Sequence, residues 1–239
     1  MKSILTQNST IGTVIEHTIA VGEALFSLGI NPLPQVDLSP ERFYSNQNIQ
    51  KNLVTSKVAY IDSFRTNQVN PSTSIQELIA HLVEVHRYLI KNKLPFIVHL
   101  IEETPISASW IKDLKLIFPL FVEDFIHHIF EEEETLFKYI LQLNEPDTSL
   151  LTNPYSQQNI SSHALEHLHE DELKGVRELT NNFILPTDSI KEKIILSALS
   201  DFDSFLAHHA KIEDTILFPK ALQLENQFLS LVKKNSFLN

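Results

Sequence analysis

Hydrophobic residues recur three and four positions apart along most of this chain, and that spacing predicts helices rather than strands. Beyond Pro71 the periodic stretches predict four long helices, at residues 74–93, 107–143, 157–182 and 188–218. Pro119 marks a point at which the second of them could break. The polar connections between them favour antiparallel neighbours. We therefore expect an all-α fold built on an up-down four-helix bundle.

Shorter helices are expected in front of the bundle. One spans residues 10–28, and a second begins at Ser39-Pro40-Glu41. The segment that follows these helices is polar and contains Asn70-Pro71, which predicts a domain boundary. The domains expected are a small helical N-terminal domain at residues 1–70 and the bundle at residues 71–239.

Two of the long helices carry a histidine followed four residues later by a glutamate, on the stripe that should face inward. The pairs are His128–Glu132 and His209–Glu213. Residues four apart lie one turn above each other, so each pair can present both side chains to the same ion. One such pair is common by chance. Two pairs among Leu, Ile and Phe favour a metal site, because burying these groups without a partner is costly.

Further histidines lie on the remaining helices. His86 falls within the apolar stripe of the first helix; taken alone, it is more typical of a hydrogen-bonded core histidine than of a ligand. The third helix offers two alternatives. His163 and His167 are four residues apart and share a face with Ile160, whereas His169 joins the apolar stripe. The two choices exclude each other, and the spacing leaves both open.

The composition narrows the chemistry. The chain has no cysteine, which excludes disulfides, thiolate zinc sites and cysteine-held Fe–S clusters. Imidazole and carboxylate ligands suit iron, manganese or zinc, and two carboxylates that can each span two ions favour a dinuclear iron or manganese centre. The net charge of −11 argues against nucleic-acid binding, which needs clustered cations.

The N-terminal residues lack the continuous apolar core of a signal peptide. No stretch of the chain approaches the 18 or so uncharged apolar residues that a membrane span needs. We therefore expect a cytoplasmic protein with no membrane partner.

The motifs around the candidate ligands resemble those of a known family over the C-terminal two-thirds of the chain. His209-Ala-Lys-Ile-Glu213, continued by Leu217-Phe218-Pro219, looks like the HxxxE…LFP signature of the iron–sulfur cluster repair di-iron proteins (the RIC, or ScdA/YtfE-like, family), which carry a hemerythrin-like HHE domain. The run from His128 to Phe137 is similar to that family's HxxxEE…LF element, with Lys138 where proline is usual. Glu166-His167 resembles the element that this family has on its third helix. His86-Arg-Tyr-Leu89 resembles the element on its first helix.

The resemblance implies a ligand set and a cofactor. The ligands carried over are His86, His128, Glu132, His163, His167, His209 and Glu213. On this basis His167 is preferred to His169, and His163 completes a seven-ligand pattern. The implied cofactor is two iron ions, oxo-bridged and also bridged by the carboxylates of Glu132 and Glu213.

The N-terminal segment is similar to the small helical domain of the same family, through residues 24–31. That domain usually continues into a paired-cysteine motif, whereas this chain has Asn31-Pro-Leu-Pro-Gln35. The resemblance implies a role in repairing Fe–S clusters damaged by nitric oxide or oxidative stress, with damaged Fe–S proteins as partners. The missing cysteines favour the alternative, a hemerythrin-type protein that binds or senses O₂ or nitric oxide without turnover. A homodimer is compatible with either function.

Overall fold

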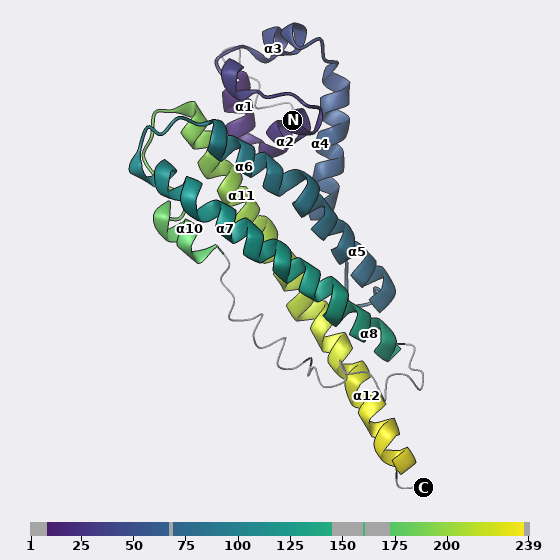
Figure 1. Ribbon diagram of the computed structural model, residues 1–239. Coiled ribbons are helices and arrows are strands. Elements are labelled where there is room, and N and C mark those ends of the chain that lie inside the picture. Colours follow the sequence, from purple (N-terminus) through teal and green to yellow (C-terminus); the bar gives the residue numbers. More distant parts are fainter. Residues whose placement is uncertain (1–8, 67–68, 145–159, 161–172, 237–239) are drawn as a thin grey trace. The chain divides into compact units, whose positions relative to one another are not determined.

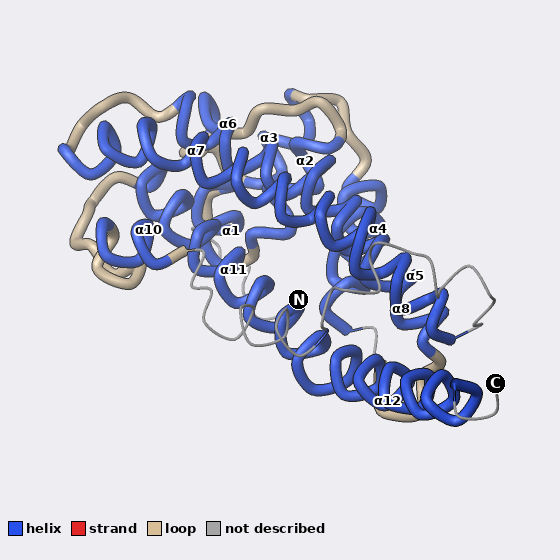
Figure 2. Tube along the Cα trace, turned by 60° about the horizontal axis from the view of Figure 1, so that its bottom comes forward, coloured by secondary structure: helices blue, strands red, loops and turns tan. Residues whose placement is uncertain are grey.

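The computed structural model describes residues 9–66, 69–144, 160 and 173–236. These residues form helices joined by loops and turns, and no strand occurs among them, as Figure 2 shows. The predicted all-α class is confirmed. Among the described helices, none combines the length and the apolar character that crossing a bilayer requires.

The N-terminal part is a set of short helices. Their bounds are α1 (Ile11–His17), α2 (Ile19–Ser27), the 3₁₀ turn η1 (Leu33–Gln35), α3 (Pro40–Asn46) and α4 (Lys51–Thr66). The single helix predicted at residues 10–28 is therefore two helices, which meet at Thr18. The backbone of Thr18 is not helical (φ −142°, ψ 80°), and two β-branched residues, Thr18 and Ile19, adjoin at this break.

Three longer helical stretches follow among the described residues, and their course can be followed in Figure 1. Each is interrupted by one π turn. The first comprises α5 (Ile75–Tyr88), η2 (Leu89–Lys93) and α6 (Leu94–Glu103). The second comprises α7 (Ser109–Glu131), η3 (Glu132–Leu136) and α8 (Phe137–Asn144). The third comprises α11 (Ile190–Ile212), η6 (Glu213–Leu217) and α12 (Phe218–Ser236). Between the second and third lies the short helix α10 (Lys174–Leu179).

The first and last predicted bundle helices are longer than expected, because each continues past a proline near its predicted end. The backbone N–H of Leu94 donates to the carbonyl of Leu89, five residues back, and that of Phe218 donates to Glu213 in the same way. A proline, Pro95 or Pro219, follows each wide turn after one intervening residue; proline lacks an N–H and crowds the preceding turn. The helix therefore continues where a stop was predicted.

Proline is not required for a π turn in this protein. The turn η3 forms with Phe137 donating to the carbonyl of Glu132, although Lys138 stands where the other two turns are followed by proline. Conversely, Pro119 lies inside α7 and no break occurs there. The break considered at Pro119 is therefore wrong.

The chain forms two compact units. Unit 1 takes its described residues from Met1–Asn67, Tyr88–Val122 and Leu173–Phe205, and unit 2 from Gln68–Arg87, Glu123–Glu172 and Leu206–Asn239. The predicted domain boundary at residue 70 stays a prediction.

Unit 1 buries a charged network within its apolar core. Lys93 is fully buried, and its ammonium donates to Glu23 Oε1 at 2.7 Å and to Asp201 Oδ2 at 2.6 Å. Arg65 also forms an ion pair with Asp201, and the hydroxyl of Tyr88 donates to Glu23. Buried charges of this kind are stable only when they are paired and hydrogen-bonded, and this network joins α2, α4, η2 and α11.

Unit 2 has a separate apolar core. Its buried members lie on α5, η3, α8, η6 and α12, with Ile160 and Ile212 in addition, and include Leu78, Leu82, Leu136, Ile140, Leu217 and Phe218. A capping box begins α5, since Ser74 Oγ accepts from the Glu77 N–H at 3.3 Å and the Glu77 carboxylate accepts from the Ser74 N–H at 3.1 Å.

Candidate metal centre

Four of the predicted ligands come together in unit 2. His86 on α5, Glu132 at the start of η3, His209 on α11 and Glu213 at the start of η6 are all buried. Each offers one ligand atom, and these four atoms lie within 4.8 Å of one another. In both HxxxE motifs the histidine is in the last α turn and the glutamate opens the π turn, so that each pair faces the same point.

The distances within this group fit a metal site. The Nε2 atoms of His86 and His209 lie 3.0 Å apart. His86 Nε2 lies 3.5 Å from Glu132 Oε2, and His209 Nε2 lies 3.4 Å from Glu213 Oε1. Ligand atoms about 2.1 Å from one metal ion are separated by roughly 3.0–3.5 Å in octahedral or tetrahedral geometry. The four side chains are therefore spaced as ligands of a shared cation would be.

The burial of the group supports the same interpretation. Glu132 and Glu213 are 1% and 0% exposed. Two carboxylates in an apolar core repel each other and lose their hydration, which is costly unless a cation compensates them. Imidazole and carboxylate ligands without a thiolate suit iron, manganese or zinc.

His128 lies at the edge of the group rather than within it. Its Nε2 is 3.5 Å from Glu132 Oε1, and its side chain is 22% exposed. Glu132 therefore directs one carboxylate oxygen toward His86 and the other toward His128. This is the arrangement that a carboxylate shared between two ions requires.

His163 and His167, with the alternative His169, lie outside the described residues. Of the seven predicted ligands, four thus come together, His128 lies beside them, and the remaining two fall outside what the structure describes.

The imidazole of His86 is held from two further sides. Its Nδ1–H donates to Glu133 Oε1 at 2.9 Å, and the ring of Phe137 stacks on it at 5.7 Å between centroids, with an interplanar angle of 9°. Glu133 belongs to a run of four glutamates at residues 131–134, a pattern that is typical of a solvated helix face. The sequence does contain a sign that Glu133 belongs to the site. An acidic residue directly follows the predicted glutamate in both HxxxE motifs, Glu133 in one and Asp214 in the other.

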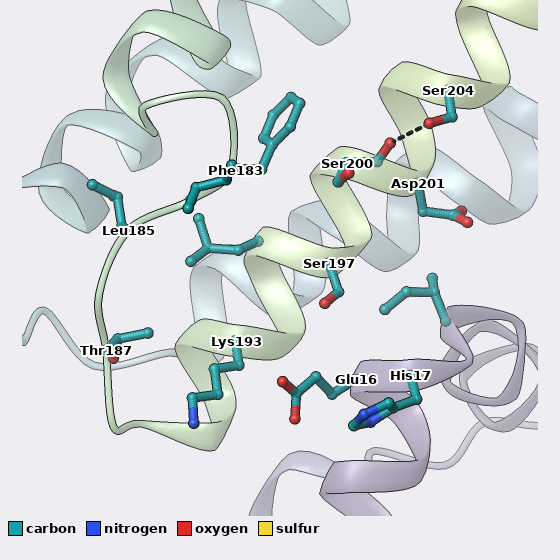
Figure 3. A pocket seen from close by; sticks show the side chains of 13 residues that line it. Glu16, His17, Phe183, Leu185, Thr187, Lys193, Ser197, Ser200, Asp201 and Ser204 are labelled. Atoms are coloured by element: carbon teal, nitrogen blue, oxygen red, sulfur yellow. Dashed lines mark hydrogen bonds between the residues drawn. The ribbon is translucent and has the colours of Figure 1, made fainter. Parts of the chain in front are cut away.

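Unit 1 contains a surface pocket of about 560 Å³ that does not involve these residues. Figure 3 shows Ser197, Ser200 and Ser204 along one side of α11, with Glu16 and His17 contributed by α1. The lining also contains Phe183, Ile184, Leu185, Thr187 and Lys193. The pocket mixes hydroxyl, charged and apolar groups, and it belongs to a different unit from the four candidate ligands.

Comparisons with known proteins identify relatives of this chain. The model of the hemerythrin HHE cation-binding domain matches residues 77–221. A probable iron–sulfur cluster repair protein of Haemophilus influenzae is 25% identical over 165 residues, which cover 63% of this chain and 67% of that protein. The matched family segment contains all seven predicted ligands and excludes the helices α1 to α4.

Proposed function

Because the chain belongs to the hemerythrin HHE cation-binding family, we propose that it is an iron-binding protein which helps to repair damaged Fe–S clusters. The observation that carries this proposal is the buried group of His86, Glu132, His209 and Glu213. Two imidazoles and two carboxylates within 4.8 Å of one another, in a core of Leu, Ile and Phe, need a cation for stability.

The proposed site would hold two iron ions. The two oxygens of Glu132 face different histidines, His86 and His128, and this supports a bridging role for Glu132. Glu213 occupies the corresponding position in the second motif, so we assign it the second bridge. His163 and His167 would complete the ligand set from the third helix. Bound iron would supply a Lewis-acidic, redox-active centre that can take up nitric oxide or O₂, or be passed on to a damaged cluster.

The chain's own residues would set how that iron is kept and released. Burial of His86, Glu132 and Glu213 keeps water from the inner ligands. His128 is partly exposed, which makes it the proposed side from which iron is exchanged. Release at an accessible ligand, with the buried ligands left in place, suits a protein that donates iron without unfolding.

The assignment to repair is supported by the relative, which is described as a probable iron–sulfur cluster repair protein. We propose damaged Fe–S proteins as the partners and the cytoplasm as the compartment. The absence of cysteine favours the second candidate, reversible binding of O₂ or nitric oxide without turnover, because no thiol is present to carry iron or a cluster.

The test begins with the full chain loaded anaerobically with Fe(II). We expect two irons per chain, near-ultraviolet absorption of an oxo-bridge after oxidation, and iron transfer to an apo Fe–S acceptor. Glu132→Ala and Glu213→Ala should each lower the content below two. Full occupancy in both variants would exclude the bridging assignment.

The chain provides matched controls for the histidines. His127 and His208 are exposed and adjoin His128 and His209 in sequence. His127→Ala and His208→Ala should leave the iron content unchanged, whereas His128→Ala and His209→Ala should lower it. If the protein forms a stable O₂ adduct and transfers no iron to the acceptor, its function is binding and not repair.

A further inference from the structure

Glu133 adjoins the candidate ligand Glu132 but differs from it in exposure. The side chain of Glu133 is 27% exposed, whereas that of Glu132 is 1% exposed. Glu133 Oε1 accepts a hydrogen bond of 2.9 Å from Nδ1 of His86. Since a carboxylate only accepts, the proton of the neutral imidazole is on Nδ1. The lone pair of Nε2 then points toward Glu132 and His209, where a metal ligand is needed.

We propose that Glu133 is a positioning residue for the metal centre, one that fixes both the tautomer and the orientation of His86. This inference rests on the proposed iron-binding function. A carboxylate bonded to the outer nitrogen of a ligating histidine also makes the inner nitrogen a stronger donor. Glu133 would thus raise the affinity for iron and favour the ferric state.

The π turn explains how two neighbouring glutamates reach one imidazole. In an α-helix successive side chains point about 100° apart, so adjacent residues rarely contact the same side chain. A π turn has more residues per turn and reduces that divergence. Glu132 and Glu133 are the first two residues of η3, and they approach His86 Nε2 and Nδ1 respectively.

Phe137 and Glu133 restrain the imidazole of His86 in different ways. Phe137 covers one face of the His86 ring, and both residues are buried. Stacking holds the plane of the ring but does not distinguish Nδ1 from Nε2. The bond to Glu133 makes that distinction, so it decides which nitrogen faces the ligand group.

The test measures the Fe(II) affinity of the full chain by anaerobic competition with a chelator. Glu133→Ala should bind iron about 10- to 100-fold more weakly, the range seen when such an outer partner is removed. Glu133→Gln should lose less, since its amide oxygen still accepts from Nδ1. Glu131→Gln is the matched control, because Glu131 is exposed on the preceding turn, and it should stay within about twofold of the wild type.

A second readout separates positioning from simple support of the fold. The reduction potential of iron-loaded Glu133→Gln should be more positive than that of the wild type, because the anionic acceptor is gone. A purely structural role would lower the melting temperature and leave the potential unchanged. If Glu133→Ala does not fold, the isosteric Glu133→Gln carries the comparison.

The outcomes distinguish this inference from the function on which it rests. Wild-type protein that takes up no Fe(II) would overturn the proposed function and this role together. Wild-type protein that binds iron, with both Glu133 variants matching its affinity and its potential, would overturn the positioning role alone.

Discussion

Lys93 is a fully buried lysine whose stability depends on two carboxylates far away in the sequence. Its partners Glu23 and Asp201 are 70 and 108 positions distant, and the ammonium also lies 5.4 Å from the ring centroid of Phe205. Breaking such a network by removing one partner leaves the others buried without compensation. Substitution of any one charged residue in this network should therefore destabilise unit 1.

We expect Lys93→Met to lower the free energy of unfolding by about 3–5 kcal/mol, measured by urea denaturation. Methionine keeps most of the volume but leaves Glu23 without its cation. Lys91→Met is the control, since Lys91 is exposed in the same π turn, and should change stability by less than about 0.5 kcal/mol. Adding Glu23→Gln to Lys93→Met should restore part of the loss. Equal effects of the two lysine substitutions would contradict the role of the network.

Because of Asp201, the stability that this network contributes depends on pH. Burial alone would raise the pKa of its carboxyl, but attraction to Lys93 and the bond to Arg65 outweigh burial and hold the pKa below the ordinary value of 3.8. A carboxyl whose pKa is lower in the folded state stabilises the fold above its unfolded pKa. That contribution is lost as the pH falls through the folded pKa.

The stability of the wild type should therefore decrease as the pH falls below about 4, and Asp201→Asn should flatten this dependence. The free energy of unfolding, measured by urea denaturation between pH 2 and 6 at constant ionic strength, checks it. Asp203→Asn serves as the control, because Asp203 pairs with Arg177 nearer the surface. An acid dependence that is unchanged by Asp201→Asn would contradict the assignment.

At the scale of elements, the π turns place the candidate ligands. Glu132 and Glu213 each open a π turn, and the apolar residues that close these turns, Leu136 and Leu217, belong to the core of unit 2. A π turn is an α-helix with one added residue. Removing that residue would rotate the following helix by about 100° relative to the glutamate and carry its apolar stripe out of the core.

Deletion of Thr215 from η6 should therefore abolish iron binding and unfold unit 2. Thr215 is exposed, and its hydroxyl donates to the carbonyl of Lys211 on its own helix, so Thr215→Ala should be nearly neutral. Iron content and circular-dichroism melting curves of both variants provide the measurement. A deletion variant that melts and binds iron like Thr215→Ala would show that the turn has no such role.

The sequence predicted the elements better than the contacts between them. Helical periodicity located His86, Glu132, His209 and Glu213 on inward stripes, because spacing within a helix is a local property. It did not predict the π turns, since a single added residue shifts the apolar stripe at one point only, and a shift that local does not stand out from the helical periodicity on either side. It also missed the bond from His86 to Glu133, which joins residues 47 positions apart.

At the scale of the whole molecule, the helices α1 to α4 belong to unit 1 together with later parts of the chain. Glu23 and Arg65 supply half of the charged network around Lys93 and Asp201. Gly22 on α2 also permits close packing, because a Cβ there would lie 2.8 Å from the ring of Phe96. The helices α2 and α4 thus contribute to the interior of unit 1.

A fragment of residues 71–239 tests the predicted domain boundary. We expect it to melt at a lower temperature than the full chain and to expose the apolar surface around Phe96, seen as increased binding of a hydrophobic dye. A fragment with Lys93→Met should lose less stability on truncation than the wild-type sequence, because the uncompensated ammonium is gone. A fragment as stable as the full chain would instead establish an independent bundle.

The burial of Glu132 and Glu213 also links iron supply to the lifetime of the protein. A ligand that binds only the native state stabilises it by about 4 kcal/mol when its free concentration is a thousand times its dissociation constant. Chains that have given up their iron would lose that increment and keep two buried, mutually repelling carboxylates. Cellular proteases act on the transiently opened state. Spent chains would thus be degraded before loaded ones, and the abundance of the protein would follow the iron available to it.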